Sequence, residues 1–372
     1  MDEEFLIQYD ESEEETLTIE RKYIPIETID SIYCFGELRF NSKFFNFLSQ
    51  NNIPLHLFNY YGFYSGTFYP RETQASGKLL ISQVSSYLDE RKRLEIAKEF
   101  IRGAVHNIIK NLEYYNNREK ELPEYIQYAK EAKYRIEEAK TIEELMGLEG
   151  GTRKKYYESW KIIINQQIDF EKREKRPPTN SANALISFRN SLLYTTVLSE
   201  IYRNQLNPTI SYLQSPGERR FSLCLDISEV FKPLIVDRLI FSILNKKIIK
   251  ESSFDFRFNS CLLNDDGKKI FIKEYDEKLS TTIKHRKLNR NVLYQTLIRY
   301  ECYKLIKHLL GDQEYKSFKI WRKYLFNFSL RRRSKKGRKI IKIFKKKTKL
   351  GSKFRFRRGN YKIFFYAIAK RS

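Results

Sequence analysis

Residues 53–68 read IPLHLFNYYGFYSGTF, and residues 79–112 read LLISQVSSYLDERKRLEIAKEFIRGAVHNIIKNL. In the first stretch, apolar residues alternate with Pro54 and His56, which is the period of a β-strand. Tyr60-Tyr61-Gly62 predicts a turn that leads into a second, aromatic strand. In the second stretch the apolar residues recur every three or four positions, which predicts one or two long amphipathic helices. The fold therefore changes from β to α, and the loop between the two stretches is the expected domain boundary.

The region before residue 53 extends the β pattern. Ser31 to Phe35 reads as another short strand, and Asn41 is a candidate N-cap for a short helix rich in phenylalanine. These elements predict a small twisted sheet with one covering helix. We interpret its many aromatic residues as core.

The region after residue 112 extends the helical pattern. Pro123 suits the first turn of a helix, and Thr141 with Glu144 forms a capping box. Further helices are predicted over residues 182–203, 225–231, 234–244 and 291–310, with a break at Pro233 between the second and third of them. Residues 246–282 are polar and mixed, with room for a short hairpin. The predicted fold class is α+β, with a small β-rich N-terminal domain over residues 1–75 and a larger all-α domain over residues 76–321.

The composition excludes several classes of protein. Hydrophobic residues make up 41% of the 372 residues and aromatic residues 15%, which is too apolar for a disordered chain. No apolar run approaches the roughly 20 residues that a membrane span needs. The N-terminus, MDEEF, is acidic where a secretory signal is basic, and the four cysteines form no CxxC pair. We therefore expect a cytoplasmic protein with no membrane partner.

The net charge of +24 is concentrated at one end of the chain. Residues 322–372 hold 21 of the 70 Lys and Arg residues and no Asp or Glu, so the rest of the chain nets only +3. This basic tail is interleaved with aromatic residues and could bind DNA or RNA by counterion release and stacking. Alternatively, it is a read-through or frameshift product, since Lys, Phe, Ile, Tyr and Asn have A/T-rich codons. If expressed, we expect it to be disordered.

Two segments carry carboxylates in suggestive places. Glu149 lies between glycines, in what reads as a helix junction accessible to a ligand. Asp226 and Glu229 are three residues apart in an apolar helix, so they share one face and need a partner there. That partner is a base, a metal or, in the simplest interpretation, a salt bridge to Lys232 or Arg238.

A third segment, Arg176 to Leu185, is a basic, Pro-containing loop that opens a helix. Such a loop can bind phosphate through its side chains and the N–H groups of the helix. The alternative is ordinary helix capping by Asn180 or Ser181.

Together, these segments resemble the integrase subunit of CRISPR spacer acquisition, the CRISPR-associated endonuclease shared by most CRISPR systems, and its type I members above all. The resemblance runs from about Tyr23 to Trp321. The motifs that carry it are Tyr23-Ile24-Pro25-Ile26-Glu27, Cys34-Phe35-Gly36-Glu37, Ile53-Pro54-Leu55-His56, Gly66-Thr67-Phe68-Tyr69-Pro70-Arg71-Glu72, Gly147-Leu148-Glu149-Gly150, Arg176-Pro177-Pro178, Asn183-Ala184-Leu185 and Leu279-Ser280-Thr281-Thr282-Ile283-Lys284-His285-Arg286.

The resemblance implies a dimerising β-rich domain followed by a helical catalytic domain that holds a divalent cation with a Glu, a His and a further acid. The first acid matches Glu149 and the last matches Glu229, with Asp226 as a neighbouring, secondary acid. Oxygen ligands suit Mg²⁺ or Mn²⁺. The implied activity is metal-dependent DNA cleavage and strand transfer, in which spacer DNA is inserted at a CRISPR repeat.

The sequence departs from the family at several places, and the strand-turn-strand expected before Tyr23 is shortened and acidic. Gln214 stands at the position of the family's metal-binding His, and an amide is a weak ligand that cannot take up a proton. Arg189 stands where the family favours glycine. The family ends near Trp321, whereas this chain continues to residue 372.

The implied partners are DNA, a second copy of the chain and a small ferredoxin-like subunit. The expected DNA contacts are Arg173, Lys175, Arg176, Asn180, His285 and Arg286. The runner-up hypothesis is a catalytically impaired, DNA-binding scaffold of the same family, because Gln214 replaces the imidazole. A third hypothesis is a helical interaction protein whose carboxylates are only salt-bridged.

Overall fold

The computed structural model describes residues 26, 29–36, 38–70, 76–165, 178–215, 221–257, 259–285, 288–321 and 364–369. The chain forms two compact units, one of Met1–Thr73 with Asn327–Ser372 and the other of Gln74–Phe326. The functional roles expected for the domains stay predictions.

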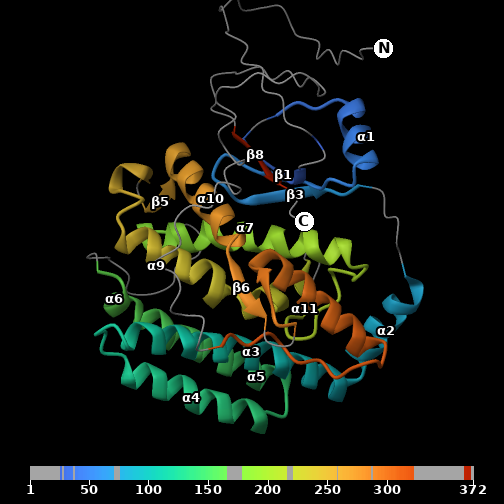
Figure 1. Ribbon diagram of the computed structural model, residues 1–372, viewed down its shortest axis with the longest axis vertical. Helices are drawn as coiled ribbons and strands as arrows, with labels where there is room; N and C mark the ends of the chain where they lie inside the picture. Colours follow the sequence, from blue (N-terminus) through green and yellow to red (C-terminus); the bar gives the residue numbers. More distant parts are fainter. Residues whose placement is uncertain are drawn as a thin grey trace, which may run out of the picture. The chain divides into compact units, whose positions relative to one another are not determined.

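The first unit is built on a four-stranded sheet in the order β3-β2-β1-β8 (Figure 1). Its strands are β1 (Ile29–Phe35), β2 (Leu55–Phe58), β3 (Tyr64–Phe68) and β8 (Phe364–Ala369). β1 and β2 are parallel, and helix α1 (Ser42–Gln50) forms the crossover that a parallel pair requires. The Asn41 side chain caps α1 by accepting a hydrogen bond from the Phe44 N–H at 2.9 Å, as predicted. β3 pairs antiparallel with β2.

β8 belongs to the basic tail and pairs antiparallel with β1, with Cys34 opposite Phe365. The rest of residues 322–372 lies outside the described residues, and the expectation of a disordered or artefactual tail stays a prediction. Three aromatic residues of β1 and β2 are core, as expected: Tyr33, Phe35 and Phe58 are buried, and Phe35 stacks on Phe58 with ring centroids 4.5 Å apart.

The second unit is mostly helical. Its helices are α2 (Gly77–Leu88), α3 (Glu90–Asn116), α4 (Pro123–Glu138), α5 (Ile142–Glu158), α6 (Trp160–Ile163), α7 (Ser181–Arg203), α8 (Ser222–Lys232), the π-helical turn η2 (Pro233–Asp237), α9 (Arg238–Asn245), α10 (Asp265–Leu279) and α11 (Tyr294–Leu309). Pro123 occupies the first turn of α4, and Thr141 caps α5 by accepting from the Glu144 N–H at 3.2 Å, both as predicted. Among the helices that the structure describes, none is long and apolar enough to cross a membrane.

The predicted α+β class is confirmed, but the second unit also contains elements that the sequence analysis missed. The hairpin of β4 (Phe254–Arg257) and β5 (Ser260–Leu263) falls within the region expected to hold one. The hairpin of β6 (Thr282–His285) and β7 (Arg290–Leu293) was not predicted, and it takes the first residues of the expected final helix. α10 was also missed, because its charged residues hide a buried stripe that includes Phe271, Tyr275 and Leu279.

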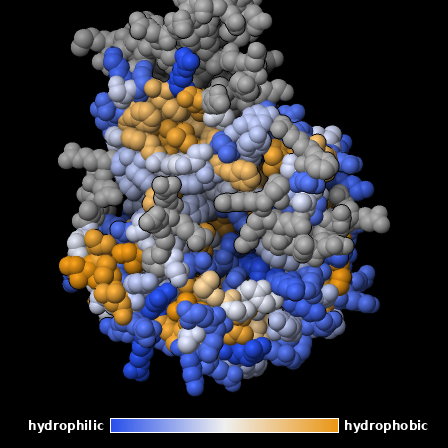
Figure 2. Space-filling view, turned by 180° about the vertical axis from the view of Figure 1, so that it is seen from behind, coloured by the Kyte–Doolittle hydropathy of each residue, from blue (hydrophilic) through white to orange (hydrophobic). Residues whose placement is uncertain are grey.

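α2 is oriented differently from the expectation. Leu80, Ile81, Val84 and Leu88 of its apolar stripe are exposed and form the hydrophobic patch at the left edge of the view in Figure 2. The helix instead buries Gln83, whose side-chain amide donates to the Asn207 carbonyl at 3.2 Å and accepts from the Asn207 N–H at 2.8 Å. α2 therefore anchors the loop that leads from α7 to residue 214.

The C-terminal strap, residues 311–321, lies across α3 and is held by buried polar side chains. The Ser317 N–H donates to Glu99 Oε2 at 3.0 Å, and the Ile320 N–H donates to Asn107 Oδ1 at 3.0 Å. The Phe318 N–H donates to Glu301 Oε1 at 3.1 Å. The strap has no regular secondary structure, so its buried N–H groups need side-chain acceptors, and these three hydrogen bonds supply them.

Gly103 of α3 gives the strap room to approach, and this yields a testable prediction. A Cβ at residue 103 would lie 2.6 Å from Ser317 Oγ, which Glu99 holds in place. We expect Gly103→Ala to lower the free energy of unfolding by about 1–3 kcal/mol through overpacking. The matched control is Gly147→Ala, where a Cβ meets nothing within 4 Å and the gain in helix propensity is about 0.5–1 kcal/mol. Denaturant unfolding measures both variants, and a stabilised Gly103→Ala protein would contradict the packing argument.

Candidate active site

Glu149 lies inside helix α5, not at the helix junction that the sequence suggested. The helix begins at its predicted cap and continues through the glycines because Leu145 and Tyr156 give it a buried face on either side of them. A Cβ at Gly147 or Gly150 would meet nothing, so these glycines make no room for a packed neighbour. A rigid helix thus places Glu149, whose side chain is partly exposed.

Asp226 and Glu229 lie one turn apart on α8, whose residues are almost all buried. The sequence predicted a helix break at Pro233, but the helix continues through η2 into α9. The π-helical turn and the missing proline N–H leave backbone carbonyls without helical partners. Asn107 and Asn111 of α3 donate to carbonyls in this stretch, those of Val230 and Pro233. The backbone next to Glu229 is therefore fixed by hydrogen bonds from α3.

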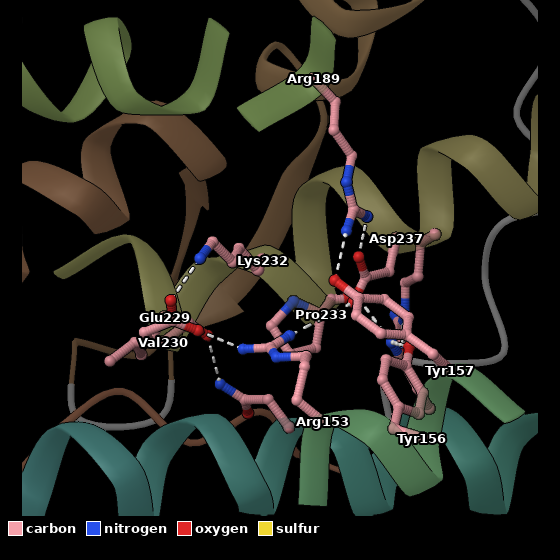
Figure 3. A network of polar contacts seen from close by, with 12 residues as sticks. Arg153, Tyr156, Tyr157, Arg189, Glu229, Val230, Lys232, Pro233 and Asp237 are labelled. Atoms are coloured by element: carbon pink, nitrogen blue, oxygen red, sulfur yellow. Dashed lines mark hydrogen bonds and ion pairs between the residues drawn. The ribbon is translucent and has the colours of Figure 1, made fainter. Parts of the chain in front are cut away.

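Arg153 joins the two glutamates and was missed by the sequence analysis. Its Nε lies 3.3 Å from Glu149 Oε1, and its Nη2 donates to Glu229 Oε2 (Figure 3). Lys232 pairs with the other oxygen of Glu229, as the simplest interpretation anticipated. Arg238 does not join this group and donates to Asn111 Oδ1 instead. The signal that could have found Arg153 is its spacing of four residues from Glu149 on one helix.

The two glutamates differ in their electrostatics. Burial, followed by the negative charge of Glu229, raises the pKa of Glu149 above its ordinary value. Burial alone would also raise the pKa of Glu229, but Lys232 and Arg153 outweigh burial and lower it to about 2. Glu229 is thus ionised at neutral pH, whereas Glu149 loses its proton less readily than a free glutamate, although Arg153 lies beside it.

Asp226 holds the backbone at Gln214. Its Oδ2 accepts from the N–H groups of Tyr212 at 2.8 Å and Leu213 at 3.0 Å, and its Oδ1 accepts from the Gln214 N–H at 3.1 Å. Burial raises the pKa of Asp226 to about 7, although these three donors oppose the shift. Both oxygens are engaged, so this carboxylate positions the loop that presents Gln214. The secondary catalytic role suggested for Asp226 stays a prediction.

Of the six residues expected to contact DNA, Asn180 and His285 lie in the part of the chain that is described. Asn180 caps α7 by accepting from the Asn183 N–H at 2.9 Å, which is the alternative that the sequence left open. His285 lies on β6, where its Nδ1 accepts from the Leu288 N–H at 3.2 Å. Arg173, Lys175, Arg176 and Arg286 lie outside the described residues. The DNA-binding roles of all six stay predictions.

A second buried ion pair lies beside the glutamates. Arg189 of α7 pairs with Asp237 of η2, and neither side chain has any exposure (Figure 3). Arg189 also donates to the Tyr157 hydroxyl at 3.3 Å, and its guanidinium lies 5.3 Å from the centre of the Trp160 ring. The arginine that replaces the family's glycine at residue 189 therefore has an ion-pair partner in Asp237, a hydrogen-bond partner in Tyr157 and an aromatic neighbour in Trp160.

The side chains around Glu149 and Glu229 fit a divalent cation in the chemistry of their donor atoms. Among the described residues, no group of three or more His, Cys, Asp or Glu side chains is placed to hold a metal ion. The site does offer two carboxylates, from α5 and α8, that converge on one positive charge, the Arg153 guanidinium. Carboxylate oxygens are the ligands that Mg²⁺ and Mn²⁺ prefer. Glu149 and Glu229 thus fit such a cation in donor chemistry, with Arg153 standing in for its charge.

Comparison with known proteins identifies the family. The family described as CRISPR associated protein Cas1 matches residues 2–277. A CRISPR-associated endonuclease Cas1 of Fusobacterium nucleatum subsp. nucleatum is 57% identical over 302 residues, which cover 81% of this chain and 89% of that protein. The structure of a Cas1 protein from Thermotoga maritima is 43% identical, with a TM-score of 0.71 over 80% of this chain and 91% of its own.

A more distant solved structure, described as a Cas6-RT-Cas1–Cas2 complex, shares the fold. Its TM-score is 0.69 at 18% identity, covering 78% of this chain and 32% of its own. The match to the family covers well over half of the residues, and the identity to the Fusobacterium protein extends across most of both chains. This chain therefore belongs to the CRISPR-associated Cas1 protein family.

Proposed function

We propose that this chain is a metal-dependent integrase that joins a DNA 3′ end to a CRISPR repeat. The observation that carries the proposal is the convergence of Glu149 and Glu229, from two different helices, on one cation. Like charges that converge in a partly buried place need positive charge between them, and a nuclease or integrase places a divalent ion there. The name of the Fusobacterium relative, an endonuclease, supports the same class of activity.

Glu149 and Glu229 would hold the ion, with the amide oxygen of Gln214 as a weaker third ligand. A bound Mg²⁺ or Mn²⁺ supplies Lewis-acid polarisation of the phosphodiester under attack. The 3′-oxygen of the incoming strand forms the new bond to phosphorus, and the 3′-oxygen of the repeat strand leaves and takes up a proton. Gln214 cannot accept the proton of the attacking hydroxyl, so that proton passes to solvent. Basic side chains such as Arg173, Lys175 and Arg176 would position the phosphates.

The partners are part of the proposal. The solved complex that shares this fold includes a Cas2 component, and we propose a corresponding small ferredoxin-like subunit for this chain, together with a second copy of the chain. The names of the relatives favour an enzyme over the alternative of an inactive scaffold. They do not bear on the effect of Gln214.

The test is strand transfer by the purified full-length protein with its small partner subunit. A labelled duplex with free 3′-hydroxyls is offered to a supercoiled plasmid that carries a repeat, with Mg²⁺ or Mn²⁺. Joined product that disappears on chelation is the expected result. DNA binding without any joined product would overturn the proposal and establish the scaffold.

Gln214→His is expected to raise strand transfer by about 10-fold, because imidazole is a better ligand for Mn²⁺ than an amide and can also accept a proton. The gain should be larger with Mn²⁺ than with Mg²⁺, which prefers oxygen. The matched control is Ser215→His, which places an imidazole at the next, exposed position. The measurement is the initial rate of strand transfer by the two variants and the natural protein, with Mn²⁺ and with Mg²⁺. Equal rates for Gln214→His and the natural protein would mean that residue 214 does not reach the ion.

A further inference from the structure

Arg153 is surrounded by carboxylates from three elements. It faces Glu149 on its own helix α5, Glu229 on α8 and Asp237 on η2, as Figure 3 shows for the last two. The guanidinium is engaged unequally: Nε and Nη2 contact the two glutamates, whereas Nη1 lies 3.9 Å from Asp237 Oδ2. That separation is too long for a hydrogen bond.

The two atoms across this gap are both buried and both unsatisfied. Neither Arg153 Nη1 nor Asp237 Oδ2 has a hydrogen-bond partner among the described residues. The other oxygen of Asp237 is taken by Arg189, so Oδ2 is the acceptor that remains. Buried polar atoms are nearly always paired, and a pair left apart at 3.9 Å marks a place that the guanidinium can occupy after a small movement.

The charges explain why Arg153 would move. Glu149, Glu229 and Asp237 carry three negative charges, and Arg153, Lys232 and Arg189 balance them. A divalent cation between Glu149 and Glu229 would meet the guanidinium at the same oxygens and repel it. Asp237 Oδ2 is the nearby acceptor that lets Arg153 stay buried and paired after it leaves the glutamates.

We propose that Arg153 is a positioning residue with two places, bridging Glu149 and Glu229 in the absence of a divalent cation and pairing fully with Asp237 when one is bound. This inference rests on the proposed cation site. In the first place, Arg153 neutralises two like charges on different helices until the ion arrives. In the second place, Arg153 frees both glutamate carboxylates for the ion, and its own buried charge stays paired with Asp237. Asp237 is then the alternative hydrogen-bond acceptor, here called the receiver, that allows Arg153 to exchange one place for the other.

The test is a double-mutant cycle read out by Mn²⁺ affinity, measured by paramagnetic resonance of the free ion with full-length protein and no DNA. Asp237→Asn removes the receiver and is expected to weaken Mn²⁺ binding about 10-fold. Arg153→Met removes the competing cation and is expected to tighten it. In the double variant, the effect of Asp237→Asn should disappear, because no guanidinium needs a second place.

Lys232→Met provides the matched control. It also removes a positive charge from Glu229, so it should tighten Mn²⁺ binding by electrostatics alone. Lys232 has no contact with Asp237 among the described interactions, so Asp237→Asn should still weaken binding about 10-fold in the Lys232→Met background. An equal effect of Asp237→Asn with and without Arg153 would overturn the proposal. If Asp237→Asn does not fold, Arg153→Met still decides, since looser Mn²⁺ binding in that variant contradicts the exchange.

The outcomes separate this proposal from the proposed function. If Mn²⁺ binding is absent, or is unchanged by Glu149→Gln, the cation site and the role of Arg153 both fail. If the cycle behaves as expected while the natural protein joins no DNA, the role of Arg153 stands and the integrase proposal fails.

Discussion

Glu149→Gln is expected to lower strand transfer by at least about 100-fold while the protein remains folded. The amide keeps the shape of the side chain but removes one of two carboxylates that would hold the cation. Loss of even an outer partner of a metal ligand costs about 10–100-fold, and a ligand itself should cost more. The fold should survive because Glu149 makes a single, partly exposed ion pair, whereas Glu229 has both oxygens engaged.

The control for this prediction is Glu143→Gln. Glu143 lies in the first turn of the same helix and is exposed, so the same chemical change there should leave strand transfer within a factor of two or so of the natural rate. Far-UV circular dichroism and thermal unfolding establish that both variants are folded. Full strand transfer by Glu149→Gln would show that Glu149 does not belong to the catalytic site.

Arg189→Met is expected to lower the free energy of unfolding by about 3 kcal/mol, near the lower end of the range for breaking a buried ion pair. The substitution leaves Asp237 buried without its hydrogen-bonded cation, and Arg153, 3.9 Å away, compensates only in part. For a unit of this size, roughly 2–4 °C of melting temperature are lost per kcal/mol, so the midpoint should fall by roughly 10 °C. Thermal unfolding followed by circular dichroism measures it.

A second variant separates the ion pair from packing at this place. Arg189→Met combined with Asp237→Leu removes both charges, and such exchanges of a buried pair for apolar residues are often neutral. The double variant should therefore recover most of the lost stability. A single Arg189→Met variant within about 0.5 kcal/mol of the natural protein, the range typical of surface substitutions, would show that Asp237 finds another partner.

Local sequence signals predicted most of the fold correctly. The caps at Asn41 and Thr141 and the first-turn proline at residue 123 begin helices where expected, because each acts through atoms within four residues of itself. The predictions failed where a distant partner overrides the local signal. Pro233 does not end its helix: the chain passes through a π-helical turn, and asparagines more than 120 residues earlier donate to carbonyls beside it.

The candidate site shows the same division. Spacing placed Asp226 and Glu229 on one face of a helix, and the resemblance to the family singled out Glu149 and Gln214. Only the tertiary structure shows that Arg153 lies between the two glutamates, that Asp226 is occupied by the backbone of residues 212–214, and that Arg189 has a partner in Asp237.

The physical reason is the range of the forces involved. Strand and helix periods, turns and caps depend on neighbours along the chain, so the change from a β-rich region to a helical one follows from the residues alone. The partner of a buried charge depends on which helices pack together, and packing joins α5, α7, α8 and η2 from positions as far apart in the sequence as Arg153 and Asp237. The sequence therefore identifies the carboxylates, whereas the packing of the helices determines which cationic side chain each carboxylate pairs with.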